Sequence, residues 1–201
     1  MRATDTAQPA PVDAPFRDRL LDGLITALGE RSYRETTVAD IVRHAKTSKR
    51  TFYAHFADKE ACLLELLESD NIRMIADIRA AVDPEADWRA QVEQAVDAYV
   101  TSIEARPAVT LAWIRELPAL GYAARPMQRR GMQRFADLLV DISSSPGFRR
   151  VHLPPVSRTT AIILLGGLRE LTAYTMEDGD DIRGISDAAV AACLGLVSAT
   201  H

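Results

Sequence analysis

The sequence has few of the features that define several classes of protein. Among 201 residues there are two cysteines, Cys62 and Cys193, with neither a C-x-x-C spacing nor a nearby pair of histidines. Neither a disulfide framework nor a metal site is therefore indicated. No uncharged run reaches the roughly 18 residues of a membrane-spanning helix. Residues 1–15 hold one base, Arg2, and no apolar core, so they do not resemble a secretion signal. We expect a soluble, cytoplasmic protein without a metal or cofactor, in which both cysteines fill the core.

Sequence signatures of catalysis are also missing. There is no glycine-rich phosphate loop, no H-E-x-x-H and no G-x-S-x-G, and two of the four histidines fall in the basic segment described below. Each of these motifs supplies a nucleophile, a metal site or a phosphate-binding loop to the enzymes that contain it. We therefore expect no catalytic residue and a protein that is not an enzyme.

The apolar residues follow helical spacing throughout, and sustained two-residue alternation is absent. This pattern predicts an all-α protein. Capping residues and prolines predict helices over 16–28, 37–45, 49–55, 59–82, 86–105, 107–117, 124–144, 156–176 and 185–199. The expected caps include Ser48, Asp58 and a weakened capping box of Thr37 with Asp40. We expect three parts: a disordered leader over 1–15, a DNA-binding domain over 16–60, and a helical effector-binding and dimerisation domain over 61–201.

The charge is unevenly distributed along the chain. The formal net charge is −4, yet residues 1–60 hold ten Lys or Arg against nine Asp or Glu, whereas residues 61–201 hold fourteen against nineteen. Five bases, including all three lysines, lie between Arg43 and Lys59, where Asp58 is the single acid. A solvated helix face is one interpretation of such a run and a nucleic-acid contact is another.

The local pattern of residues 36–67 favours the second interpretation. Two short predicted helices meet there at a tight turn, with the spacing of a helix-turn-helix, whose second helix enters the DNA major groove. The apolar residues that would fix the crossing of the two helices are Ile41, Val42, Phe52 and Phe56. The exposed first turn of the second helix would reach base edges with Thr47, Ser48, Lys49, Arg50 and Thr51. Tyr53, His55 and Lys59 lie at the rim, where side chains meet phosphates.

This segment resembles the TetR family of bacterial transcriptional regulators, whose pattern reads T-V-x-D-I-A-x-x-A-G-V-S-x-G-T-F-Y-x-H-F-x-x-K-E-x-L. The matching residues are Thr37, Val38, Asp40, Ile41, Ala45, Ser48, Thr51, Phe52, Tyr53, His55, Phe56, Lys59, Glu60 and Leu63. The resemblance implies a homodimer that binds palindromic DNA and responds to a small ligand in its C-terminal domain. It also implies DNA contacts by Thr37, Ser48, Thr51, Tyr53, His55 and Lys59.

Three residues depart from the family pattern. Lys46 replaces the glycine of the turn, where a positive φ would cost on the order of 1 kcal/mol. Thr47 replaces a valine, and Arg50 replaces a small residue. These changes add polarity toward DNA, so we expect strongly salt-dependent binding. The full predicted contact set is Thr37, Lys46, Thr47, Ser48, Lys49, Arg50, Thr51, Tyr53, His55 and Lys59.

The C-terminal part offers candidates for an effector pocket and a dimer interface. The pocket candidates are Tyr99, Trp113, Met127, Phe135 and Tyr174, with Arg115, Glu116 and His152 as polar anchors; the alternative is that these aromatic residues belong to the core. The last two predicted helices carry long uncharged stretches and must be covered on all sides, by a second subunit or within one. The interface candidates are Ile162, Leu165, Gly166, Leu168, Val190, Leu194 and Val197.

The resemblance, together with the basic segment, implies a ligand-responsive homodimeric regulator, expected to be a repressor, which binds palindromic operator DNA in the major groove. The predicted partners are double-stranded DNA, a second copy of the chain and an unidentified small-molecule effector. The departures at 46, 47 and 50 leave open an alternative, a helical ligand-binding or scaffold dimer that no longer binds DNA.

Overall fold

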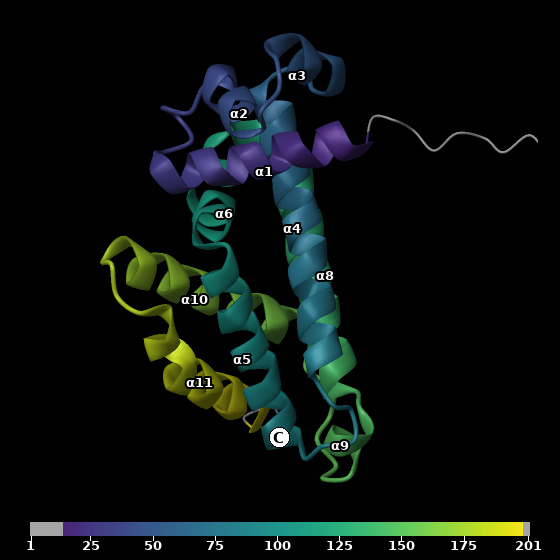
Figure 1. Ribbon diagram of the computed structural model, residues 1–201. Helices are drawn as coiled ribbons and strands as arrows, with labels where there is room; N and C mark the ends of the chain where they lie inside the picture. The colour runs from purple at the N-terminus through teal and green to yellow at the C-terminus, as the bar shows by residue number, and fades with distance from the viewer. Residues whose placement is uncertain (1–13, 199–201) are drawn as a thin grey trace, which may run out of the picture. The chain divides into compact units, whose positions relative to one another are not determined.

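The computed structural model describes residues 14–198, and these residues form helices and connecting turns without a strand (Figure 1). The expected all-α fold is confirmed. The chain divides into two compact units, with the boundary between Leu63 and Leu64. Of the expected leader over residues 1–15, residues 1–13 lie outside the described part of the chain. Ala14 and Pro15 belong to the first helix.

The first unit holds α1 (Ala14–Glu30), α2 (Val38–His44) and α3 (Lys49–His55). The predicted range of the third helix is confirmed, and the first two agree to within two residues at each end. Ile41, Val42, Phe52 and Phe56 are all buried, as the sequence predicted, and the rings of Phe52 and Phe56 lie 5.6 Å apart. These side chains seat the two short helices on α1.

A glycine sets how closely α1 and α2 approach. A Cβ atom on Gly23 would lie 2.6 Å from the Ile41 carbonyl oxygen and 2.9 Å from the Ala45 nitrogen. Both distances are too short for a carbon atom, so only glycine fits at this crossing. The periodicity of the sequence gave no sign of this requirement.

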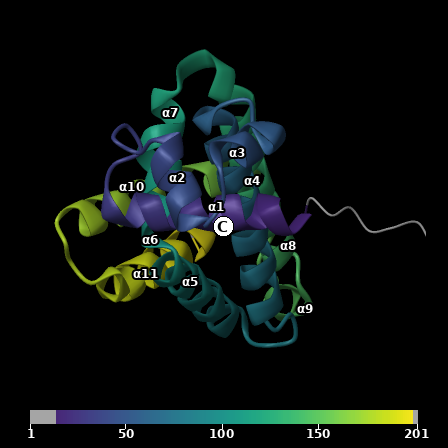
Figure 2. The same ribbon diagram turned by 45° about the horizontal axis from the view of Figure 1, so that its top comes forward.

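Helix α4 (Lys59–Ala81) begins in the first unit and continues into the second. Asp58 caps it as expected, because its Oδ1 accepts a hydrogen bond from the Ala61 N–H at 2.8 Å. The other elements of the second unit are α5 (Trp88–Ala105), α6 (Pro107–Leu111), a π-helical turn (Ala112–Glu116), α7 (Leu117–Ala119), a 3₁₀ turn (Gly121–Ala124), α8 (Arg125–Ser143), α9 (Pro146–Arg149), α10 (Arg158–Glu177), a 3₁₀ turn (Ile182–Ile185) and α11 (Ser186–Ser198). Helix α11 packs along α5 and α10 (Figures 1 and 2).

The sequence predicted one regular helix over 107–117, and the structure corrects this. A π-helical turn interrupts the helix at Ala112–Glu116. Pro118 lies just beyond this turn and has no N–H to donate to the Ile114 carbonyl four residues earlier. Turns of this kind are frequent at functional sites, and this one contributes Trp113 and Ile114 to the cavity described below.

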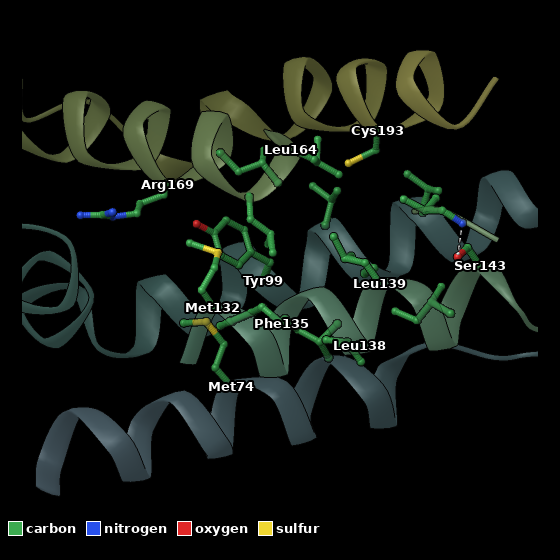
Figure 3. A pocket seen from close by; sticks show the side chains of 18 of the residues that line it. Met74, Tyr99, Met132, Phe135, Leu138, Leu139, Ser143, Leu164, Arg169 and Cys193 are labelled. Carbon is green, nitrogen blue, oxygen red and sulfur yellow. Dashed lines mark hydrogen bonds between the residues drawn. The ribbon is translucent and has the colours of Figure 1, made fainter. Parts of the chain in front are cut away.

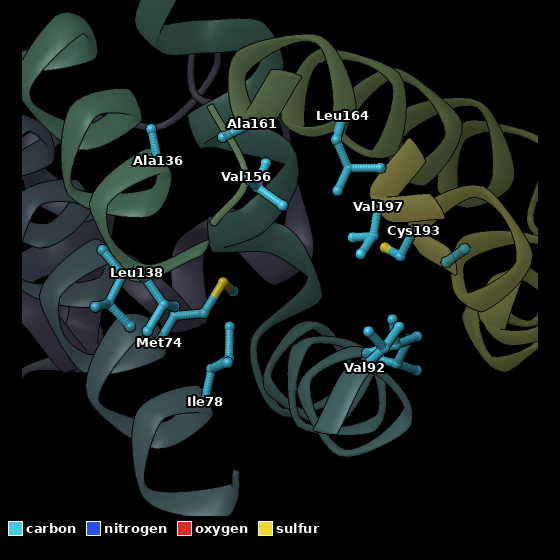
Figure 4. Packing of buried hydrophobic residues seen from close by; sticks show 14 of the residues in the cluster. Met74, Ile78, Val92, Ala136, Leu138, Val156, Ala161, Leu164, Cys193 and Val197 are labelled. Atoms are coloured by element: carbon cyan, nitrogen blue, oxygen red, sulfur yellow. The ribbon is translucent and has the colours of Figure 1, made fainter. Parts of the chain in front are cut away.

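The core of the second unit is formed between α4, α5, α8, α10 and α11. Figure 4 shows Met74 and Ile78 of α4 facing Leu138 of α8, with Val92 of α5 near Cys193 of α11. Both cysteines are buried, as expected. Burial raises the pKa of the Cys193 thiol to about 11, so this thiol is neutral at physiological pH.

A buried glutamine joins two loops at one end of this unit. Gln91 is fully buried, and its Nε2 donates to the carbonyl oxygens of Pro84 at 3.1 Å and Ala86 at 3.0 Å. Its Oε1 accepts from the Ser145 hydroxyl at 2.9 Å, and the Gly147 N–H donates to the Pro84 carbonyl at 3.1 Å. The loop before α5 is thus tied to the turn before α9.

Replacing Gly147 with alanine is expected to lower the free energy of unfolding by about 3 kcal/mol. The new Cβ would overlap the Ala86 carbonyl oxygen and the Gln91 amide nitrogen, so the two loops must separate and lose hydrogen bonds. Urea denaturation measures the change. The control is Gly29→Ala, where no atom lies within 4 Å of the new Cβ and no loss of stability is expected. Equal stability of both variants would contradict the interpretation.

Candidate functional site

The first turn of α3 projects a basic, polar surface. Ser48 caps the helix, because its Oγ accepts a hydrogen bond from the Thr51 N–H at 3.1 Å. The cap fixes the start of the helix, so Lys49 and Arg50 occupy its first turn, where both are exposed. Tyr53 follows one turn later and is 58% exposed although its ring is large and apolar. An exposed aromatic side chain beside two cations is typical of a binding surface.

Lys46, which stands where the family pattern has glycine, has a left-handed conformation in the turn between α2 and α3. Its φ is +50°, in the region that favours glycine. The guanidinium of Arg19 in α1 donates to the carbonyl oxygens of Ala45 and Lys46, both at 2.6 Å from Nη2. These charge-assisted hydrogen bonds hold the turn in place and offset the strain of a side chain with positive φ.

The N-terminus of α2 is closed by a reciprocal capping box. The Thr37 hydroxyl oxygen accepts from the Asp40 N–H at 3.2 Å, and the Asp40 carboxylate accepts from the Thr37 N–H at 3.0 Å and from the Thr37 hydroxyl at 2.7 Å. The hydrogen bond from the Thr37 hydroxyl is the main reason that the pKa of Asp40 lies below its usual value, and the nearby Arg31 and Arg43 contribute. The sequence predicted this box, and the structure confirms it.

The capping box predicts a pH dependence of stability. The pKa of Asp40 is lower in the folded state, so its stabilising effect is complete above the unfolded-state pKa of about 3.9 and is lost as the pH falls through the folded-state value. Asp40→Asn is therefore expected to be less stable than the wild type at pH 7, and the two stability curves should converge in acid. Urea denaturation from pH 7 to pH 2 tests this. A constant difference between the curves would contradict the assignment.

The structure places Lys59, a predicted phosphate contact, against the backbone of the first unit. Its ammonium group donates to three backbone carbonyl oxygens, those of Tyr33 at 2.8 Å, Arg34 at 3.4 Å and Thr36 at 2.6 Å, and lies over the Tyr33 ring. All three of its N–H donors are thus directed into the first unit. These hydrogen bonds fasten the α1–α2 loop to the start of α4.

The other predicted DNA contacts lie in and beside the helix-turn-helix. Six of them are exposed, namely Thr37, Lys46, Ser48, Lys49, Arg50 and Tyr53. Thr47, Thr51 and His55 are half-buried.

The second unit contains a cavity of about 150 Å³ with an overwhelmingly apolar wall. Side chains from α4, α5, α8, α10, α11 and the π-helical turn line it (Figure 3). Three of the predicted pocket residues, Tyr99, Trp113 and Phe135, lie in this wall. The other two do not, because Met127 is buried elsewhere and Tyr174 is 60% exposed beneath Arg115.

The predicted polar anchors also lie outside the cavity wall. Arg115 forms ion pairs with Glu170 at 2.8 Å and Glu177 at 2.6 Å, and its hydrogen bonds lower the pKa of Glu177. Glu116 and His152 do not line the wall either. Inside the wall, the Tyr99 hydroxyl is hydrogen-bonded to the Thr172 hydroxyl at 2.9 Å, and burial raises the pKa of Tyr99.

The predicted dimer-interface residues divide between two locations. Leu165, Leu168 and Val197 line the cavity, and Val197 is buried inside the unit, which corrects its expected place at the surface. Val190 and Leu194 are half-buried, whereas Ile162 and Gly166 are exposed. The apolar side chains and glycines that α10 and α11 leave exposed are Ile162, Ile163, Gly166, Gly167, Tyr174, Ala188, Ala191, Ala192 and Gly195, which we call the α10–α11 face.

Two further features bear on the class of protein. Among the described residues, His, Cys, Asp and Glu side chains form no group of three suited to a metal ion. No helix within 14–198 is both long enough and apolar enough to cross a membrane.

In the first unit, a capped basic helix follows a tight turn and packs on two other helices. The second unit is helical and contains an apolar cavity. This arrangement is that of a helix-turn-helix transcription factor with a separate C-terminal domain. Residues 20–66 match the model of a family described as bacterial regulatory proteins, tetR family. Residues 20–66 therefore form a DNA-binding domain of this family of bacterial regulatory proteins.

Solved structures with the same fold extend over almost the whole chain. The fatty acid degradation regulator FadR of Bacillus halodurans has a TM-score of 0.73 at 18% identity, covering 92% of this chain and 95% of that one. FadR of Bacillus subtilis, solved in complex with stearoyl-CoA, has a TM-score of 0.75 at 16% identity, covering 92% and 99%. A TetR-like regulator from Rhodococcus sp. RHA1 has a TM-score of 0.68 at 18% identity, covering 94% and 98%. No curated protein matches the chain.

Proposed function

We propose that the protein is a ligand-responsive homodimeric regulator, acting as a repressor, that inserts α3 of each subunit into the major groove of a palindromic operator. The observation that carries this proposal is the exposed first turn of α3, where Lys49 and Arg50 stand beside the exposed ring of Tyr53. Cations at this end of a recognition helix reach guanine edges and phosphates. The proposed contacts are Thr37, Lys46, Thr47, Ser48, Lys49, Arg50, Thr51, Tyr53 and His55.

The proposed dimer forms through the α10–α11 face. Ile163 is 63% exposed there, among alanines and glycines that carry no charge. Exposed apolar side chains of this kind are typical of a subunit interface. A two-fold axis through the α10–α11 face relates two identical DNA-binding units. Each unit then contacts one half-site, so a palindromic operator is expected.

The proposed effector has a long apolar part that fills the cavity in each subunit. Leucine, isoleucine, valine, methionine and phenylalanine side chains make up most of the wall, which favours a hydrocarbon chain over a polar metabolite. The relative from Bacillus subtilis was solved with stearoyl-CoA, and this supports a fatty-acyl chain as the ligand class. Met74 and Ile78 of the continuous helix α4 belong to the wall, so the ligand would act through α4.

The test combines selection of bound sequences from a random DNA pool with effector release. The expected result is an inverted repeat with half-sites about one helical turn apart. Dodecanoyl-CoA or dodecanoic acid should then weaken binding to the selected duplex, since an effector must bind one state better than the other. Failure to select any sequence, by a protein that is dimeric and binds the acyl probes, would favour the alternative of a helical ligand-binding dimer that does not bind DNA.

A further inference from the structure

The cavity has a polar end whose hydrogen-bonding groups are incompletely paired. Most polar groups in its wall have partners: the Tyr99 hydroxyl pairs with Thr172, the Thr110 hydroxyl donates to the Arg106 carbonyl, and the Ser143 hydroxyl donates to the Val140 carbonyl. These groups therefore need no hydrogen bond from a ligand.

Asn71 of α4 differs from these residues. It lines the cavity, is 5% exposed, and its Oδ1 has no hydrogen-bond partner among the described residues. A buried unpaired acceptor destabilises a fold, and a leucine of similar size would avoid this. An unpaired amide in an otherwise apolar wall therefore indicates a role in binding.

Arg169 of α10 supplies a second unpaired group in the same wall. Its Nη2 donates to the Ile114 carbonyl of the π-helical turn at 2.6 Å, which fixes the guanidinium. Its Nε is buried and has no hydrogen-bond partner within the described part of the chain. In Figure 3, Arg169 and Ser143 lie at opposite ends of the cavity, with Tyr99 and Leu139 between them.

The π-helical turn connects Asn71 to Arg169. A Cβ on Gly131 would overlap the indole of Trp113 and lie 3.4 Å from the Asn71 Nδ2, so this amide and the tip of the indole meet at Gly131. Ile114, which Arg169 holds, directly follows Trp113 in the chain. Both residues are thus associated with the same π-helical turn, Asn71 through the Trp113 indole and Arg169 through the Ile114 carbonyl. We call this part of the wall the Trp113 end.

We infer that the effector carries a hydroxyl or carboxyl group at one end of its apolar chain, and that Asn71 and Arg169 bind this group at the Trp113 end. The inference rests on the proposed apolar effector. The Asn71 Oδ1 needs a donor and the Arg169 Nε needs an acceptor, and a hydroxyl or a protonated carboxyl group supplies both. An ether or ester oxygen supplies an acceptor alone.

Three twelve-carbon probes test the inference on the full chain: 1-dodecanol, dodecanoic acid and dodecyl methyl ether. Calorimetry should show the wild type binding the alcohol about 5- to 10-fold more tightly than the ether, which has no donor. Asn71→Leu should bring this ratio to about one and raise the melting temperature, since it removes an unpaired buried group. Comparing the acid with the alcohol shows which oxygen function the site prefers.

Met74→Leu is the matched control, because Met74 lies one turn further along α4 in the same wall and is apolar. It should retain the preference for the alcohol. Three results overturn the inference: equal affinity of the wild type for alcohol and ether, a preference that survives in Asn71→Leu, or a fall in stability of this variant with equally weakened binding of all probes. If no probe binds the wild type, the apolar effector itself is wrong, and the inference fails with it.

Discussion

Replacing Lys49 and Arg50 together with alanine is expected to lower the affinity for the operator by about 10³-fold. The proposed dimer presents both residues twice, so the variant would lack four cationic side chains per operator. Each base or phosphate contact contributes on the order of 1 kcal/mol or more. Both side chains are exposed, and the Ser48 cap stays in place. The fold should therefore be unchanged and the effect confined to binding.

The salt dependence distinguishes phosphate contacts from base contacts. Removing one cation that binds a phosphate should reduce the slope of log K against log salt concentration by about one, so the slope falls by up to about four per dimer. Fluorescence anisotropy between 50 and 300 mM salt provides both the affinity and the slope. A large fall in affinity with an unchanged slope would assign the two side chains to base edges.

The control is the double replacement Arg149→Ala and Arg150→Ala. These residues are also an adjacent, exposed basic pair, located at α9 in the second unit, and their removal changes the net charge by the same amount. They are expected to leave affinity and slope within about two-fold of the wild type. If both double variants behave alike, the effect is one of total charge and α3 is not the reading element.

The sequence was most informative where a local physical rule determines the structure. Ser48 and Asp58 were predicted as helix caps from residue type and position alone, and both make the expected hydrogen bond. Such features depend on a few neighbouring residues, so they can be derived without knowing the tertiary fold.

Features that depend on interactions between distant segments were not predicted. Lys59 binds carbonyl groups more than twenty residues away, and nothing in its own helix signals this. Asn71 has the character of an ordinary polar residue in a long helix, and only the fold places it in the cavity wall. Large apolar residues at helical spacing included Tyr99, Trp113 and Phe135, which line the cavity, but also Met127 and Tyr174, which do not. Spacing alone does not say which side of a helix a cavity occupies.

Gly195→Arg is expected to convert the dimer into a monomer and to weaken operator binding strongly. Gly166, Gly167 and Gly195 are exposed within helices, and no atom of the subunit lies within 4 Å of a Cβ placed on any of them. Each glycine destabilises its helix by about 1 kcal/mol relative to alanine. Packing within the subunit does not require glycine at these positions, because an alanine side chain would have room there. Close approach of a helix from a second subunit supplies a reason for glycine there.

An arginine at position 195 would bury an unpaired charge in that interface, which opposes association strongly. Sedimentation at micromolar concentration should then detect a monomer, while circular dichroism stays helical because the subunit itself has room for the side chain. Since a monomer engages one half-site alone, operator affinity should fall by about 10²- to 10⁴-fold.

Gly29→Arg provides the control for this substitution, since Gly29 is likewise exposed near the end of a helix, with no atom within 4 Å, but lies in the first unit. It should remain dimeric. A Gly195→Arg protein that stays dimeric and binds its operator normally would place the subunit interface elsewhere and leave the three exposed glycines of α10 and α11 without an explanation. A monomer that still binds one half-site weakly would separate the two functions: α3 reads the DNA, and the α10–α11 face supplies the second reading helix.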